Sequence, residues 1–263
     1  MDAPSPYLMP NRDALARERL DALGALFNPV TRRRLTGIGV GAGWRCWEVG
    51  AGHSSLLRLL ADAVGPSGRV VATDIDPRGM GDGQPDWVEV LAGDVARDEP
   101  PPGPFELVHA RLVLTHVPER EAALATMVSA LAPGGVLLIE DADVSLQPLA
   151  SLEDTPAAAL ANKIRSSFRL LLTRRDAEPS FGRSIPGHMV DLGLADVRAD
   201  AWFPLVDPRS TRIEQLTVTL LRNQLEDAGL LEAEEIDAHL ANLDAGLVQV
   251  VQPPLVGAWG TRT

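Results

Sequence analysis

The sequence is poor in cysteine and lysine. Cys46 is the only cysteine among 263 residues, which excludes an internal disulfide and a zinc site built from several cysteines. The simplest interpretation of this composition is a reducing, cytoplasmic location. Lys163 is the only lysine, so arginine supplies almost all of the basic charge.

Excess positive charge and long hydrophobic runs are also lacking. The chain carries 24 Lys and Arg against 36 Asp and Glu, a formal net charge of −12 and a pI near 4.8. Proteins that bind nucleic acid or anionic membranes need a basic surface, so we expect neither partner. No uncharged apolar stretch approaches the roughly 20 residues that cross a bilayer, and the N-terminus does not resemble a signal peptide. With nucleic acid and membranes not expected as partners, a small molecule is the partner left open.

Short apolar runs alternate with amphipathic stretches between residues 44 and 140. The runs predict strands at 44–49, 69–73, 87–91, 105–110 and 136–139. Leu57, Leu60 and Val64 share one face of a helix between the first two strands. A later helix is predicted from Leu124, Val128 and Leu131, ended by the Pro-Gly-Gly at 133–135. Nearly all-apolar strands separated by helices indicate an α/β fold with a parallel sheet covered on both faces.

The length of the sequence fits one large domain, or a core with a sizeable insertion. Residues 1–40 form a predicted N-terminal helical segment that covers the ligand site, and residues 41–263 form the domain itself. Helical insertions at about 145–190 and 207–250 are expected to act as a lid over the ligand. Within the second insertion, Thr211 and Glu214 match a capping box.

The strongest motif is the segment WEVGAGHS at 47–54, which follows the first predicted strand. Gly50 and Gly52 allow the backbone to approach a ligand closely, at the N-terminus of the next helix. The dinucleotide-binding fingerprint would place a glycine at position 55, where Ser55 stands. Asp74 and Asp94 follow the next two strands, at the sheet edge where nucleosides bind. Together these residues predict a nucleoside-shaped crevice.

These motifs resemble those of class I S-adenosylmethionine-dependent methyltransferases. The resemblance rests on EVGAG at 48–52, on Asp74, on Gly93-Asp94 and on LAPGG at 131–135, in that order. The segment at 109–117 and the acidic residues at 140–143 resemble the small-molecule branch, which includes ubiquinone/menaquinone-type and natural-product enzymes. The resemblance implies a Rossmann-like, seven-stranded, mostly parallel sheet with helices on both faces and a helical lid.

The resemblance also implies a cofactor, S-adenosylmethionine, with S-adenosylhomocysteine as product. Glu48 would orient its methionine end, Asp74 would bind the ribose hydroxyls, and Asp94 would meet the adenine. Many members carry a third glycine after Gly52, where this chain has His53, which either bonds the ligand carboxylate or lies exposed. The full set of implied cofactor positions is Glu48, Gly50, Ala51, Gly52, His53, Asp74, Ile75, Asp94, Val95, Ala110 and Arg111.

Methyl transfer from a sulfonium is an in-line displacement, so much of the catalysis can come from positioning and from excluding water. A general base is needed only if the acceptor must lose a proton. The candidates are His116, Asp143 and His188, with Glu140 and Asp141 also considered. We interpret His109, within the fourth strand, as structural. The spacing of the acidic residues at 140–143 does not fit a metal-dependent member, so no metal is expected.

The sequence therefore predicts transfer of a methyl group from S-adenosylmethionine to an O, N or C atom of a small acceptor. Leucine-rich, lysine-poor insertions favour an apolar or aromatic acceptor. One alternative is a protein of the same fold that binds the cofactor but has a regulatory or non-methylating role. A less favoured alternative is an NAD-dependent oxidoreductase. A homodimer is left open.

Overall fold

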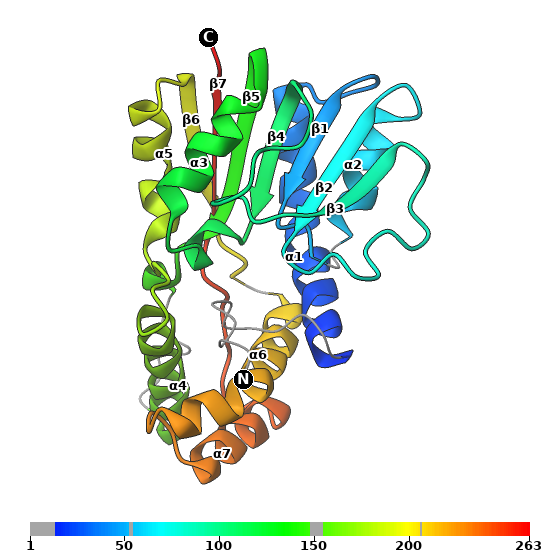
Figure 1. Cartoon of the computed structure of the whole chain (residues 1–263). Helices are drawn as coiled ribbons and strands as arrows, with labels where there is room; N and C mark the ends of the chain where they lie inside the picture. The colour runs from blue at the N-terminus through cyan, green and yellow to red at the C-terminus, as the bar shows by residue number, and fades with distance from the viewer. Residues whose placement is uncertain (1–13, 53–54, 148–154, 206) are drawn as a thin grey trace.

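The central element of the protein is a twisted sheet of seven strands in the order β3-β2-β1-β4-β5-β7-β6 (Figure 1). The computed structural model describes residues 14–52, 55–147, 155–205 and 207–263. The neighbours from β3 to β5 pair in parallel, whereas β7 runs antiparallel to both β5 and β6. The strands are β1 Arg45–Val49, β2 Arg69–Asp74, β3 Val88–Ala92, β4 Phe105–Arg111, β5 Leu131–Ala142, β6 Ala195–Trp202 and β7 Leu255–Thr261.

Helices cover both faces of this sheet. Along β1 and β4, Cys46 and Leu107 pack with α1 and α2, whereas Trp47 and Val108 pack with α3 and α5. Because both faces of the central strands are buried, β1, β2 and β4 are mostly apolar, whereas the edge strand β6 carries charged residues and is largely not buried. The helices are α1 Ala14–Ile38, α2 Leu56–Val64, α3 Arg120–Ser129, α4 Pro156–Thr173, α5 Phe181–Asp191, α6 Pro208–Asp227 and α7 Ala233–Asp244, with short 3-10 helices η1 Leu114–His116 and η2 Val144–Leu146. The predicted fold class is confirmed.

Three helices lie beyond the carboxyl ends of the parallel strands. Helices α4, α6 and α7, here called the helical lobe, lie together below the sheet in Figure 1. They share an apolar core that includes Ile164, Leu221 and Ile236. Helix α5 instead packs on β5, β6 and β7. The predicted lid segment 145–190 thus divides between the helical lobe and the layer that covers the sheet.

A helix was correctly predicted before residue 131, but the predicted position of its end was wrong. Helix α3 ends at Ser129, and Leu131 begins β5, where it pairs with Phe105 of β4. Apolar spacing over a few residues fits either a helix face or a buried strand, and here the strand pairing prevailed. The Pro-Gly-Gly at 133–135 lies in the first part of β5, where the register with β4 shifts.

The predicted capping box at Thr211 and Glu214 was also wrong. Helix α6 begins three residues earlier, at Pro208, and the carboxylate of Asp207 accepts a hydrogen bond of 2.9 Å from the amide of Arg209. A proline at the first helical position after an aspartate is the stronger start signal. Glu214 therefore lies within the helix. Among the described residues, no helix has the length and apolarity needed to cross a membrane.

Candidate functional site

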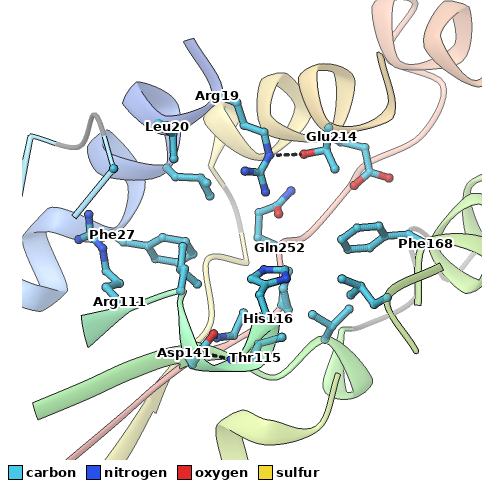
Figure 2. Close-up of a pocket in the computed structure, with 18 of the residues that line it drawn as sticks. Arg19, Leu20, Phe27, Arg111, Thr115, His116, Asp141, Phe168, Glu214 and Gln252 are labelled. Carbon is cyan, nitrogen blue, oxygen red and sulfur yellow. Dashed lines mark hydrogen bonds between the residues drawn. The ribbon is translucent and has the colours of Figure 1, made fainter. Parts of the chain in front are cut away.

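Two adjoining pockets lie at the carboxyl ends of the parallel strands. The rim pocket runs beside the ends of β1, β2 and β3, and the inner pocket lies between the sheet and helices α1, α4 and α6. Gly50, Leu112 and His116 line both, so the pockets meet at these residues. A ligand can therefore extend from one pocket into the other. Figure 2 shows residues of the inner pocket.

The loop after β1 allows a ligand close access to the backbone. Gly50 and Gly52 have φ values of 62° and 53°, in the left-handed region that favours glycine. A Cβ at Gly50 would lie 2.5 Å from Cγ2 of Val113, so no other residue fits there without a shift. The amide of Gly52 donates a hydrogen bond of 2.9 Å to Oδ2 of Asp74, which fixes the loop against the end of β2.

The rim pocket combines carboxylates with apolar surface. Oδ1 of Asp74 accepts a hydrogen bond of 2.8 Å from the amide of Asp76, so backbone amides orient both carboxylate oxygens. Each oxygen retains a second lone pair for a ligand hydroxyl. Ile75 is 59% exposed and offers an apolar side chain beside them, and Asp94 and Val95 also line the pocket. This arrangement suits a neutral sugar attached to a flat apolar ring.

Glu48 is one of the buried acidic residues that line the inner pocket. Its Oε2 lies 2.5 Å from Nδ1 of His109, and Nε2 of His109 lies 3.3 Å from Oε2 of Glu140. Burial alone would lower the pKa of His109, but the two carboxylates raise it to about 9, so the ring is a cation at neutral pH. Burial raises the pKa of Glu48, and its pairing with His109 opposes that effect.

Glu140 connects this buried group to helix α1. Its carboxylate accepts hydrogen bonds of 2.5 Å from Thr31 Oγ1 and from Arg34 Nη1. Burial alone would raise the pKa of Glu140, but His109 and Arg34 bring it down to about 2. Arg111 belongs to the same network, because its Nη1 donates to Asn28 at 2.9 Å and to Thr31 at 3.1 Å. Helix α1 is thus held on the sheet directly beside the inner pocket.

Backbone strain marks the junction of the two pockets. Leu112 has a φ of 59°, which is uncommon for a residue other than glycine, and its amide donates 2.8 Å to the carbonyl of Glu140. Strain of this kind persists only when surrounding contacts hold it, and it is frequent at functional sites. The turn it makes directs the chain into η1 and brings His116 to the wall of both pockets.

His116 and Asp141 are the titratable groups at the floor of the inner pocket. Burial and the nearby charge of Arg19 lower the pKa of His116 to about 4, so its imidazole is neutral at pH 7. Burial raises the pKa of Asp141 to about 6, although amide donors such as that of Thr115, at 3.0 Å, oppose the shift. A neutral imidazole can accept a hydrogen bond from a bound molecule, but a pKa of about 4 makes it a weak base at pH 7.

The structure separates the other predicted catalytic residues from the inner pocket. Asp143 is fully buried, and its carboxylate accepts hydrogen bonds from Ser145 Oγ and from the amide of Arg183. His188 lies on α5 against Phe181, in a separate surface hollow. Neither lines the inner or the rim pocket. We therefore retain only His116 among these three as a candidate.

The structure also locates the predicted cofactor positions. Those that line a pocket are Glu48, Gly50, Ala51, Gly52, Asp74, Ile75, Asp94, Val95 and Arg111. Ala110 is buried in the core cluster that includes Trp47 and Val108, and it does not line either pocket. His53 lies outside the described residues, as does the first part of the predicted N-terminal segment, through residue 13.

Several pocket residues could not be found from the sequence motifs. The wall away from the sheet is formed by Arg19 of α1, Arg165 and Phe168 of α4, Glu214 of α6, and Gln252 before β7. These side chains come from four distant parts of the chain and share no motif. Helical periodicity predicts only that α4 and α6 have buried faces.

Comparisons with known proteins are consistent with this geometry. A protein family described as methyltransferase domain matches residues 11–231. The chain belongs to this methyltransferase family. The resemblance found in the sequence motifs is thereby confirmed.

Two curated relatives and one solved structure show how far the similarity of this methyltransferase domain extends. Methyltransferase str3 of Strobilurus tenacellus is 30% identical over 192 residues, which cover 70% of the chain and 65% of the relative. A ubiquinone/menaquinone biosynthesis C-methyltransferase of Ectopseudomonas mendocina is 30% identical over 175 residues, covering 60% of the chain and 68% of the relative. Phosphoethanolamine N-methyltransferase 2 of Haemonchus contortus, solved with S-adenosyl-L-methionine, has a TM-score of 0.56 at 14% identity, covering 94% of the chain and 56% of the solved chain. That structural likeness concerns the fold.

Proposed function

We propose that this protein transfers a methyl group from S-adenosylmethionine to an O, N or C atom of a small organic acceptor. The observation that carries the proposal is the junction of two pockets at Gly50, Leu112 and His116. One pocket suits an adenosine, and the other offers a buried carboxylate beside a chamber lined largely by apolar side chains. A sulfonium placed at the junction would face that chamber.

The residues at the site fit this cofactor. Asp74 offers oriented carboxylate oxygens to the ribose hydroxyls, and Ile75 offers apolar surface to the adenine, with Asp94 and Val95 beside it. Glu48 presents a carboxylate to the ammonium of the methionine end. The glycine backbone at 50–52 leaves room for the chain between these two ends. The cofactor carries no phosphate, which agrees with the carboxylates that line both pockets.

The protein's contribution to the reaction is positioning and exclusion of water. The cofactor supplies an activated methyl group on sulfur, which an acceptor atom can attack in line. Helices α1, α4 and α6 enclose the inner pocket, so they hold an acceptor in place and keep bulk water away. His116 lies at the junction as a neutral imidazole, which can accept a hydrogen bond from the acceptor and orient it, and can take its proton only as a weak base.

The walls of the inner pocket support an acceptor with an apolar or aromatic body. Phe27 of α1, Phe168 of α4 and Leu221 of α6 line it, and Figure 2 shows the two phenylalanine rings on opposite sides of the space. Aromatic and aliphatic side chains in a cleft favour flat, apolar molecules.

The test has two stages. Calorimetry first compares binding of S-adenosylhomocysteine with binding of NAD, and we expect only the former to bind. The protein is then incubated with S-adenosylmethionine and a library of phenols, amines and enols, and formation of S-adenosylhomocysteine is followed by mass spectrometry. Acceptor-dependent product supports the proposal. Binding without product across the library would favour a regulatory or non-methylating role, and binding of NAD alone would contradict the proposal.

A further inference from the structure

A buried carboxylate lies on the wall of the inner pocket in helix α6. Glu214 is 8% exposed, and its Oε1 makes no hydrogen bond within the part of the chain that the structure describes. Nε2 of His239 lies 3.4 Å from that oxygen and Nε of Arg165 lies 3.7 Å from it, and neither contact has hydrogen-bond geometry. Oε1 of Glu214 therefore lies close to two basic side chains while its own capacity to accept hydrogen bonds is not used.

The ion pair of Glu214 with Arg165 leaves this oxygen without a hydrogen bond, because the Nε–Oε1 distance is 3.7 Å. Helix α6 is capped by Asp207, so Glu214 does not serve the helix start. The neighbouring inward residues Ile213 and Val218 are apolar, and a carboxylate among them is costly unless its oxygens are satisfied. A hydrogen-bond donor supplied by a ligand in the pocket would remove that cost.

Glu214 lies across the inner pocket from the floor. In Figure 2, Thr115, His116 and Asp141 stand at the edge of the sheet, whereas Arg19 and Glu214 stand at the opposite side. A molecule that fills the space between them has one end beside His116, where the pockets meet, and the other end beside Glu214. Its middle contacts apolar side chains.

We propose that Glu214 accepts a hydrogen bond from a hydroxyl or N–H group on the acceptor, at the end remote from the methylated atom. This inference rests on the proposed function and narrows the acceptor to an apolar or aromatic molecule with a polar donor at each end. The basic side chains nearby have other partners: Arg165 Nη2 donates 3.1 Å to the carbonyl of Val251, and Arg19 Nε donates 2.8 Å to Thr217 Oγ1.

Charge at this wall favours a neutral donor. Arg165 offsets the charge of Glu214, so an ammonium group would gain little from the pair as a whole. An acceptor with a carboxylate at this end would place a second anion against Glu214, and like charges in a buried site repel strongly. The expected order of binding at the remote end is therefore hydroxyl, then methyl, then carboxylate.

Three probes of one shape test this order: naphthalene-2,6-diol, 6-methylnaphthalen-2-ol and 6-hydroxynaphthalene-2-carboxylate. Their affinities are measured by calorimetry on the full chain, with and without S-adenosylhomocysteine. Because one hydrogen bond contributes about 1 kcal/mol, we expect the diol to bind about fivefold more tightly than the methyl compound. The carboxylate should bind more weakly than either.

Variants assign this preference to Glu214. Glu214→Leu removes the hydrogen-bond acceptor and should abolish the preference for the diol, whereas Glu214→Gln keeps one carbonyl oxygen and should retain part of it. Glu234→Leu is the matched control, because Glu234 is exposed on α7. Circular dichroism and the affinity for S-adenosylhomocysteine show whether each variant folds.

The outcomes separate this inference from the function on which it rests. Tightest binding of the carboxylate, an unchanged preference in Glu214→Leu, or no binding of the diol would each overturn the role given to Glu214. If S-adenosylhomocysteine fails to bind, the proposed function fails, while the probe affinities measured without it still report on Glu214.

Discussion

Nδ1 of His109 lies 2.5 Å from Oε2 of Glu48, and both side chains are fully buried between β1 and β4. The ring is also 3.3 Å from Glu140, so one imidazolium separates two carboxylates that would otherwise repel each other. The pairing with His109 holds Glu48 at the inner pocket. Glu140 links the same buried group to helix α1, because its carboxylate accepts a hydrogen bond from Arg34. Stability and the shape of the pocket are therefore linked through His109.

We expect His109→Gln to destabilise the protein and to weaken binding of S-adenosylhomocysteine. The substitution removes the imidazolium that compensates two buried carboxylates. Breaking a buried ionic group in this way lowers the free energy of unfolding by about 3–5 kcal/mol. Urea denaturation measures the stability and calorimetry the affinity. His188→Gln is the control, because His188 lies on α5 in a separate hollow and should change neither quantity. Equal stability of the two variants would contradict the role of His109.

The same group predicts how stability depends on pH. The pKa of His109 is about 9 in the folded chain, above its ordinary value of 6.5, so the folded state binds this proton more tightly than the unfolded state. Its stabilising contribution is complete below pH 6.5 and is lost as the pH rises through 9. The free energy of unfolding should therefore fall between pH 7 and pH 9.

The comparison with His109→Gln isolates this effect. Burial raises the pKa of the Cys46 thiol, which adds a separate loss of stability at alkaline pH in both proteins. The difference between the wild-type and variant curves should therefore shrink steadily from pH 7 to pH 9. A difference that stays constant over this range would show that His109 is neutral when folded.

The sheet and the glycine loop were predictable because their signals are local. A strand buried on both faces is a short apolar run, and the glycines and aspartates of the loops directly follow such runs. The pairing of Glu48 with His109 was not predictable, because it depends on the register that places these two residues opposite each other in β1 and β4. The sequence suggested a structural role for His109 but could not identify its partners.

The inner pocket was less predictable for a related reason. Arg19, Phe168 and Glu214 meet there only because α1, α4 and α6 pack around one space, and no spacing in the sequence expresses that arrangement. Asp143 shows the converse. Its position at the end of β5 suggested the site, but its side chain turns toward Ser145 and α5. Asp141 and Asp143 are only two positions apart in the sequence, but only Asp141 lines the inner pocket.

We expect Gly50→Ala to lower both stability and cofactor affinity. The residue has a φ of 62°, and the added Cβ would lie 2.5 Å from Val113 at the junction of the pockets. A residue other than glycine in this conformation costs about 1–3 kcal/mol, and relief of the contact would shift the loop that lines the site. Urea denaturation and calorimetry with S-adenosylhomocysteine measure the two effects.

Gly81→Ala is the matched control for this substitution. Gly81 is exposed, and a Cβ there would meet nothing within 4 Å. Its variant should keep the stability and affinity of the wild type, or gain slightly in stability because alanine restricts the unfolded chain. If Gly50→Ala behaves in the same way, the loop after β1 does not need a glycine at position 50.

Asp74→Ala is expected to weaken binding of S-adenosylhomocysteine by about tenfold or more, since two hydrogen bonds to the ribose would be lost at about 1 kcal/mol each. The substitution also removes the acceptors for the amides of Gly52 and Asp76, so the stability of each variant must be measured beside its affinity. Asp74→Asn keeps one carbonyl oxygen and should lose less affinity.

Asp82→Ala is the matched control for this substitution. Asp82 lies at an exposed position of the following loop, so its variant should bind as the wild type does. An unchanged calorimetric affinity in a well-folded Asp74→Ala would remove Asp74 from the ribose site, and would leave Ile75 and Asp94 as the residues that hold the adenosine.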